Sequence, residues 1–215
     1  MDVVNNRRAT FKKILNVTSG NFLEQYDFFL FGFYATYIAA KFFHSENEYV
    51  SLMMTFTVFA AGFLMRPLGA IFLGAYVDRV GRRKGLIVTL SLMAIGTILI
   101  TFVPGYETIG FFAPLLVLVL RLLQGLALGG EYGGAATYVA EHAPSNKRGF
   151  YTSWIQTTAT LGLFLALGII ILIRQAQGVE TFSSEWGGWR YPFWISLLLV
   201  IVSIFIRMKM SESPV

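Results

Sequence analysis

Six long apolar segments limit what this chain can fold into. A helix rises about 1.5 Å per residue and a bilayer's hydrocarbon core is about 30 Å thick, so about 20 apolar residues span it. With 55% hydrophobic and only 13% charged residues, the chain is far more apolar than a soluble domain needs. We expect an all-α membrane protein, one domain over residues 1–215. Its six transmembrane helices are expected at about residues 20–43, 50–77, 85–103, 111–140, 150–173 and 191–206.

The positions of Lys and Arg predict the orientation of these spans. Twelve of the 17 lie in one set of loops and three in the opposite set. Cytoplasmic loops are the basic ones, so both termini are expected in the cytoplasm, with the chain in the inner membrane. The net charge of +5 is then a topology signal, and no nucleic-acid partner is expected. The twelve are Arg7, Arg8, Lys12, Lys13, Arg79, Arg82, Arg83, Lys84, Lys147, Arg148, Arg207 and Lys209; the three are Lys41, Arg174 and Arg190.

Few residue types suited to covalent or metal chemistry are present. The chain has no cysteine, and its two histidines, His44 and His142, lie near span ends. This pattern predicts neither a disulfide nor a metal site. No Ser/His/Asp arrangement or phosphate-binding loop is visible, so the chain is not expected to be an enzyme or to need a cofactor.

Charged residues inside the spans are the main functional signal. A charge at mid-span costs roughly 2.5–3.5 kcal/mol on insertion scales, so such residues usually face a bundle interior or a water-filled pathway. With one polar neighbour, Gln124, they form the predicted proton and substrate pathway. The charges are Glu24, Asp27, Arg66, Arg121 and Glu131.

Helical periodicity groups these charges into stripes. At about 100° per residue, Asn21, Glu24, Asp27, Phe31 and Tyr34 share one face of the first span. Spans 85–103 and 191–206 have no mid-span ionisable residue and are expected to be lipid-facing scaffold around a wet centre made by the other four. Two more stripes are expected, Arg121, Gln124, Glu131 and Tyr138 in the fourth span and Ser153, Gln156, Thr157 and Thr160 in the fifth.

The three intramembrane acids outnumber the two intramembrane arginines, Arg66 and Arg121. One carboxylate is therefore expected to lack a cationic partner within the chain. An acid in that situation can bind and release a proton, which is what proton coupling requires.

A ladder of glycines runs along the fourth span. Gly125, Gly129 and Gly133 recur every four residues, with Gly130 and Gly134 beside them. Small residues at this spacing let two helix backbones approach closely, so the ladder predicts a packing seam.

The loop between the second and third spans reads "GAYVDRVGRRKGL". It resembles the signature loop of the major facilitator superfamily, in which a glycine turn, an acid and clustered cations hold the cytoplasmic gate. The resemblance implies that role here, with Glu141 as an ionic partner. The matching residues are Gly74, Asp78, Arg79, Gly81, Arg82, Arg83 and Lys84.

Further stretches resemble the metabolite:proton symporter branch of that superfamily. They are "GNFLEQYDF", "FLMRPLGAIFLG", "RLLQGLALGGEYGG" and "WGGWRYPF". The resemblance implies proton-coupled symport, with the proton as coupling ion and Arg121 tied to proton transfer. The substrate stays open between a small organic acid such as citrate, suited to Arg66 or Arg121, and a zwitterionic osmolyte such as betaine, suited to the acids and to aromatic rings such as Tyr26 and Tyr34.

Transporters of this superfamily have twelve spans in two halves, each half an inverted 3+3 repeat. Six spans therefore predict an N-terminal half that needs a second six-helix half from a separate chain, a longer gene or a homodimer. The alternative is a truncated or split half without transport activity of its own.

Overall fold

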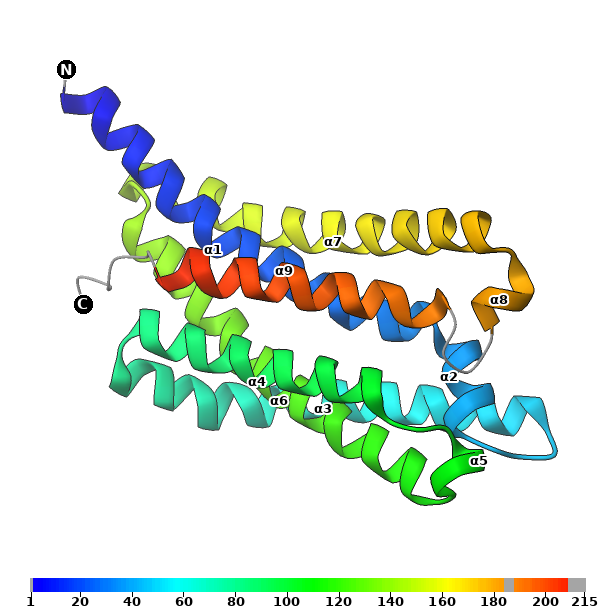
Figure 1. Cartoon of the computed structure of the whole chain (residues 1–215). Helices are drawn as coiled ribbons and strands as arrows, with labels where there is room; N and C mark the ends of the chain where they lie inside the picture. The colour runs from blue at the N-terminus through cyan, green and yellow to red at the C-terminus, as the bar shows by residue number, and fades with distance from the viewer. Residues whose placement is uncertain (1, 184–187, 209–215) are drawn as a thin grey trace.

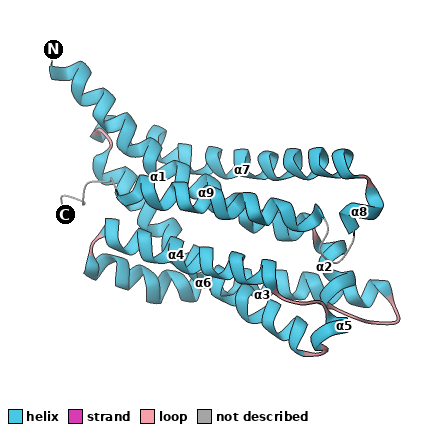
Figure 2. Cartoon of the chain, viewed as in Figure 1, coloured by secondary structure: helices cyan, strands magenta, loops and turns pink. Residues whose placement is uncertain are grey.

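The computed structural model describes residues 2–183 and 188–208, and the side chains within them except those of residues 2–13, 23 and 183. Some residues of the sequence analysis lie outside the described residues: Trp186 and Gly187 of the "WGGWRYPF" stretch, and Lys209 of the charge count. The side chains of four more counted cations are also not described, those of Arg7, Arg8, Lys12 and Lys13. The described part is helical, with short connecting loops and no strand (Figure 2).

The helices match the expected apolar segments and extend several of them. The first expected span is divided at Tyr34, although backbone hydrogen bonds from Tyr34 N to Leu30 O and from Ile38 N to Tyr34 O continue across the break. The helices are α1 (Asp2–Phe33), α2 (Ala35–Phe42), α3 (Glu48–Val80), α4 (Arg82–Phe102), α5 (Tyr106–Ile109), α6 (Phe112–His142), α7 (Arg148–Gln177), α8 (Val179–Ser183) and α9 (Tyr191–Met208), with 3₁₀ turns η1 (Ser145–Lys147) and η2 (Gly188–Arg190).

Among the described residues, five helices are long and apolar enough to cross a membrane: α3, α4, α6, α7 with η1, and α9 with η2. The helix α1 is not among them, because Asn21, Glu24, Gln25 and Asp27 lower the hydropathy of its apolar part. Many large apolar side chains lie on the outer surface, as expected where lipid is the solvent. The most exposed include Leu64, Ile71, Phe72, Phe164, Leu172 and Leu198.

The long helices run side by side, with the start of α1 and the end of α9 at one end of the bundle (Figure 1). The α3–α4 turn lies at that same end, and α2, α5 and α8 lie at the other. The most extensive helix contacts are between α3 and α6, α1 and α7, and α4 and α6, while α9 packs on both α1 and α4.

The glycine ladder forms the close contact between α3 and α6, as predicted, at two of its three positions. A Cβ atom at Gly125 would overlap the carbonyl oxygen of Gly62, and one at Gly129 would overlap that of Arg66. Gly69 of α3 meets the Leu126 carbonyl in the same way. Gly133 was expected in the seam, but no described atom lies within 4 Å of its Cβ position, because there its face of α6 has turned away from α3.

Candidate functional site

A buried hydrogen-bond network surrounds Asp27. The Thr97 hydroxyl of α4 donates to Asp27 Oδ2 at 3.0 Å, and the Ser196 hydroxyl of α9 donates to Asp27 Oδ1. Gln124 Nε2 donates to Thr97 Oγ1 at 2.8 Å, and Arg121 Nη1 donates to Gln124 Oε1 at 2.8 Å. One chain of polar contacts therefore joins an acid of α1 to an arginine of α6 through α4.

The two arginines expected in the pathway share an aromatic platform. The guanidinium carbon of Arg66 lies 4.1 Å from the centroid of the Phe28 ring, and that of Arg121 lies 4.3 Å from it. Arg121 also lies over Phe31 and donates to the Phe28 carbonyl oxygen at 3.0 Å. Cation–π contact stabilises guanidinium groups out of water, so both charges can stay in a membrane-buried site without a paired carboxylate.

An open cavity of about 510 Å³ lies where four helices meet. It is formed by α1, α3, α6 and α7, the four that were expected to make the wet centre. Of the residues predicted for the pathway and for the polar stripes, Arg66 and Gln156 line it. The lining residues are Gln25, Phe29, Arg66, Pro67, Ala70, Leu128, Gly129, Tyr132, Gln156 and Ala159.

A second buried charge cluster joins α1, α6 and α9. Arg207 Nη2 donates to Glu131 Oε1, and Thr89 of α4 donates to Glu131 Oε2 at 3.1 Å. Arg207 Nη1 lies 3.8 Å from Glu24 Oε1 and donates to the Leu86 carbonyl oxygen at 2.7 Å. Both acids and the arginine are at most 1% exposed.

These contacts correct two predictions. Arg207 was counted among the loop cations because it stands near a span end, yet it is buried and balances the three acids with a third arginine. The helices α4 and α9 were expected to be scaffold, yet they supply Thr97, Ser196 and Arg207 to the acids. An absence of mid-span charge does not make a helix lipid-facing, since hydroxyl groups serve as partners for buried carboxylates.

The remaining predicted cavity residues are distributed differently. Asn21 is buried and donates to the Ile155 carbonyl oxygen of α7 at 2.8 Å. Tyr34 and Tyr138 lie in two separate apolar clusters and do not line the cavity. Thr160 is exposed on α7 and donates at 3.3 Å to the Gln156 carbonyl oxygen of its own helix.

The signature loop is a single-residue turn between two helices. Gly81 has φ 102°, a conformation that glycine adopts without strain, and it separates α3 from α4. Arg82 pairs with Asp78 and lies 3.8 Å from Glu141 of α6, the expected ionic partner. Arg83 donates to the Met208 carbonyl oxygen at the end of α9. Gly74, Arg79 and Lys84 lie on the neighbouring turns, where Arg79 and Lys84 are exposed.

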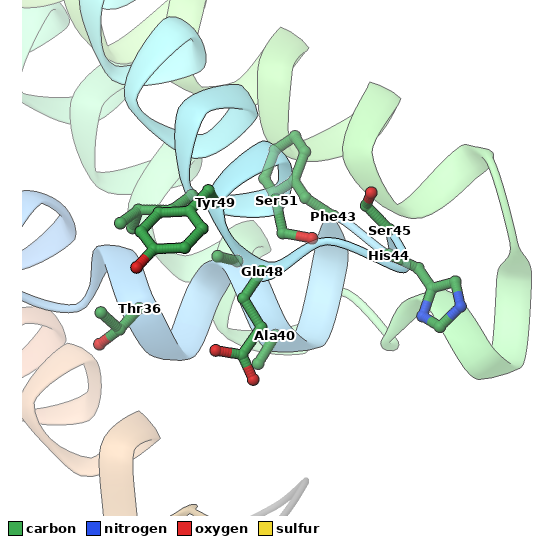
Figure 3. Close-up of a pocket in the computed structure, with 10 residues that line it drawn as sticks. Thr36, Ala40, Phe43, His44, Ser45, Glu48, Tyr49 and Ser51 are labelled. Atoms are coloured by element: carbon green, nitrogen blue, oxygen red, sulfur yellow. The ribbon is translucent and has the colours of Figure 1, made fainter.

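Another cavity, of about 410 Å³, lies beside α2 (Figure 3), at the end of the bundle away from the signature loop (Figure 1). It lies between α2 and the start of α3, and Thr36, His44, Glu48 and Tyr49 line it. None of the predicted site residues is there. Within the described part, no three His, Asp or Glu side chains are grouped so that they could hold a metal ion.

Sequence reasoning missed the residues that complete these networks. Thr97, Ser196 and Thr89 carry no distinctive signal, because Ser and Thr in helices commonly bond the carbonyl one turn earlier. Gln25 and Tyr132, which line the open cavity, lie beside the predicted stripes and not on them. The one available signal was Arg207, an arginine directly after an apolar run that contains Ser196 and Ser203.

Long apolar helices surround buried arginine and carboxylate networks, and a cavity opens between four of them. This arrangement is typical of a multi-pass membrane transporter domain. The Sugar (and other) transporter family matches residues 13–215. The chain belongs to this family, within the major facilitator superfamily, as the resemblance predicted.

Three curated relatives are named as a symporter, a permease and a transporter. A "Citrate-proton symporter" from Salmonella typhi is 54% identical, over 96% of this chain and 47% of its own length. An "Alpha-ketoglutarate permease" from Escherichia coli K12 is 40% identical, over 93% of this chain and 46% of the relative. A "Proline/betaine transporter" from Salmonella typhimurium is also 40% identical, over 94% of this chain and 40% of the relative. The chain therefore spans about half the length of the curated relatives it matches.

The fold also matches solved structures. The proton:xylose symporter XylE, bound to 6-bromo-6-deoxy-D-glucose, superposes with a TM-score of 0.86. The match covers 97% of this chain and 46% of XylE at 20% identity, so it shows a shared fold.

Proposed function

We propose that this chain is one half of a proton-coupled symporter that carries a small organic acid, citrate-like or dicarboxylate, across the inner membrane. The observation that carries the proposal is the Arg66 side chain in the wall of the 510 Å³ cavity. In the described part it has no ion-pair partner, and its Nε has no hydrogen-bond partner. A guanidinium in such a position can bind a carboxylate through two parallel hydrogen bonds.

The charges near the cavity favour an anion. Arg66 and Arg121 share the Phe28 ring, and Asp27 is the acid of that network, so the group carries one excess positive charge. Gln25 and Gln156 add amide donors and Tyr132 a hydroxyl. A substrate carboxylate would balance the excess charge in a site of low polarity.

A zwitterionic osmolyte is less well supported by the same cavity. Tyr26 and Tyr34, the rings expected to hold a quaternary ammonium, are fully buried, and the Tyr26 hydroxyl donates to the Pro192 carbonyl oxygen. Only Phe29 and Tyr132 offer aromatic faces at the cavity. The relatives include both citrate and proline/betaine transporters.

The membrane arrangement remains part of the proposal. We place both termini in the cytoplasm, because the basic α3–α4 turn lies at the end of the bundle where α1 begins and α9 ends (Figure 1). A 3+3 inverted repeat would make α1–α2, α3 and α4 equivalent to α6, α7 and α9. The helix packing supports this repeat. The contact of α3 with α6 corresponds to that of α7 with α1, and the contact of α4 with α6 corresponds to that of α9 with α1.

The transport unit is proposed to contain a second six-helix half, since the relatives are about twice as long and alternating access needs two bodies that rock against each other. The competing hypothesis is a half that does not transport by itself. Uptake of labelled citrate and of labelled betaine into vesicles, with an imposed pH gradient, tests both. It is measured for the chain alone and for the chain together with a complementary half.

The proposal predicts citrate accumulation that a protonophore abolishes and that Arg66→Gln reduces. Arg174→Gln, which removes an exposed charge from the end of α7, is the matched control and should accumulate citrate normally. Accumulation unaffected by the protonophore, or a preference for betaine, would contradict the proposal. Uptake only with the complementary half would identify the chain as half of the unit.

A further inference from the structure

The cluster of Glu24, Glu131 and Arg207 contains two acids and one base in a fully buried position. It lies apart from the open cavity, whose lining includes none of the three. Gly20 shapes it, because a Cβ atom there would overlap the Arg207 guanidinium. The cluster therefore carries one excess negative charge if both acids are ionised, which is costly in a desolvated site.

The three buried acids differ in the donors they receive. Asp27 accepts hydrogen bonds from Thr97 and Ser196, and Glu131 accepts them from Thr89 and Arg207. Neither carboxyl oxygen of Glu24 has a hydrogen-bond partner among the described residues. Within the described part of the chain, its one favourable charge contact is Arg207 at 3.8 Å, and that guanidinium already donates to Glu131.

We propose that Glu24 is a proton-binding residue and takes up the coupling proton. The step is the addition of one H⁺ from water to the carboxylate, giving the neutral carboxylic acid and leaving Arg207 paired with Glu131 alone. The cluster is then neutral. The coupling role rests on the proposed function, whereas proton binding at Glu24 does not depend on it.

The charged groups around Glu24 can be named for each helix packed against it. Arg207 of α9 faces Glu24 through Nη1 and Glu131 of α6 through Nη2, and Asp27 lies one turn further along α1. The helices α4 and α7 carry charged residues only near their ends. A single cation therefore serves two acids, and protonation of one of them removes the competition.

Polar atoms without partners continue from Glu24 along α1 and α9. Asn21 Oδ1, one turn before Glu24, and Ser203 Oγ, one turn before Arg207, are both buried and lack a partner among the described residues. The Glu24 carboxylic acid would add one donor to a region that offers these acceptors. They also mark a polar route along which a proton can reach the cluster.

Arg207 connects the proton site with the signature loop. It donates to the Leu86 carbonyl oxygen in α4, and Arg83 donates to the Met208 carbonyl oxygen beside it. Loss of the proton from Glu24 gives Arg207 a second anion to pair with. A shift of Arg207 toward Glu24 would weaken its hydrogen bonds to Glu131 and to the Leu86 carbonyl oxygen. The packing between α9 and the start of α4 would then change.

Infrared spectroscopy of this chain in lipid vesicles tests the proton directly, without transport. The amide variants Glu24→Gln and Asp27→Asn are compared with the wild type near neutral pH, using exchange into D₂O to identify the carboxylic-acid band. We expect the band in the wild type and in Asp27→Asn, and its loss in Glu24→Gln. A band that persists in Glu24→Gln, or no band in the wild type, would overturn the proposal.

Thermal unfolding in detergent separates Glu24 from Glu131. Glutamine resembles a protonated glutamate, so Glu24→Gln should leave the melting temperature near that of the wild type. Glu131→Gln removes the ionised partner of Arg207 and should lower it clearly. The reverse order would assign the proton to Glu131 and contradict the proposal.

The coupling role is tested by proton uptake on citrate binding, followed with a pH indicator in weakly buffered solution on a preparation that binds citrate. We expect uptake in the wild type and its loss in Glu24→Gln. Proton uptake that persists in Glu24→Gln would overturn the coupling role of Glu24 but not its proton binding. Failure of the wild type to bind any carboxylate would refute the proposed function, while the infrared result would still decide whether Glu24 holds a proton.

Discussion

Thr97 donates a hydrogen bond of 3.0 Å to Asp27, and this contact ties α4 to the acid of α1. The hydroxyl also accepts from Gln124, so it connects the acid with the amide that holds Arg121. Both neighbours are buried, and neither can exchange this partner for water. A helix without a mid-span charge thereby becomes part of the charged site.

The first prediction concerns the removal of this hydroxyl. Thr97→Val keeps the shape of the side chain but leaves Asp27 with one donor fewer and Gln124 without its acceptor. We expect a loss of about 1–3 kcal/mol in the free energy of unfolding, the cost of leaving buried polar groups unsatisfied. Chemical unfolding in detergent measures it.

The control is Thr57→Val on α3. The Thr57 hydroxyl is exposed and donates only to the Met53 carbonyl of its own helix, so this change should leave stability within about 0.5 kcal/mol. Equal effects at the two sites would mean that the Asp27 network does not stabilise the fold.

Hydropathy predicted the helical fold, because a backbone in lipid must satisfy its own hydrogen bonds and an α-helix does so within one segment. The apolar segments appear as helices, and five of the described helices are long and apolar enough to cross a membrane. A cavity between α1, α3, α6 and α7 was expected as well. The sixth span and the limits of the spans stay predictions. The helix α1 begins at Asp2, far before its apolar part, because bilayer thickness limits only the apolar part of a helix. The proposed roles of Glu24, Asp27, Arg121 and the other site residues stay predictions.

The partners inside the bundle could not be read from the sequence. Periodicity gives the direction of a side chain relative to its own helix, but not which neighbour lies there. Glu24 and Asp27 were assigned to the wet centre, whereas their side chains meet α9 and α4, and Gln25 lies at the cavity instead. Arg207 was misassigned because a cation near a span end fits the topology rule equally well.

The second prediction tests whether Arg66 binds a carboxylate. Arg66→Ala should weaken citrate binding about 10–100-fold, the equivalent of roughly 1.5–3 kcal/mol for hydrogen bonds to a charged group. Arg66→Lys keeps the positive charge but not the bidentate geometry of the guanidinium, so it should lose less citrate affinity than Arg66→Ala. Equilibrium binding of labelled citrate measures both variants.

The matched comparison uses a ligand with one carboxylate fewer. If Arg66 contacts the substrate, the affinity difference between the wild type and Arg66→Ala should shrink when the contacted carboxylate is absent. An unchanged citrate affinity in Arg66→Ala would show that the cavity at Arg66 is not the binding site.

The third prediction concerns the ion pair between Arg82 and Glu141, whose side chains are 20% and 18% exposed. A double-mutant cycle of Arg82→Gln and Glu141→Gln should give a coupling energy of about 0.2–1 kcal/mol, because partly exposed pairs contribute little. The coupling should decrease as salt is added. The exposed neighbour Arg79 provides the control: a cycle of Arg79→Gln with Glu141→Gln should give a smaller coupling energy.

The fourth prediction compares two glycines of one ladder. Gly129→Ala places a methyl group against the Arg66 carbonyl oxygen, a backbone atom that cannot move aside, so α3 and α6 must separate. Such overpacking costs about 1–3 kcal/mol, and thermal unfolding in detergent should show a lower melting temperature. Because Gly129 also lines the cavity, the displaced α3 should carry Arg66 with it and weaken citrate binding.

Gly133→Ala adds the same methyl group four residues later on the same helix, where nothing lies within 4 Å of it. Alanine is the better helix former by up to about 1 kcal/mol, so this variant should be at least as stable as the wild type. The sequence pattern treats the two glycines alike, whereas the geometry separates them. Equal destabilisation by both changes would show that the ladder acts through backbone flexibility and not through the close contact between α3 and α6.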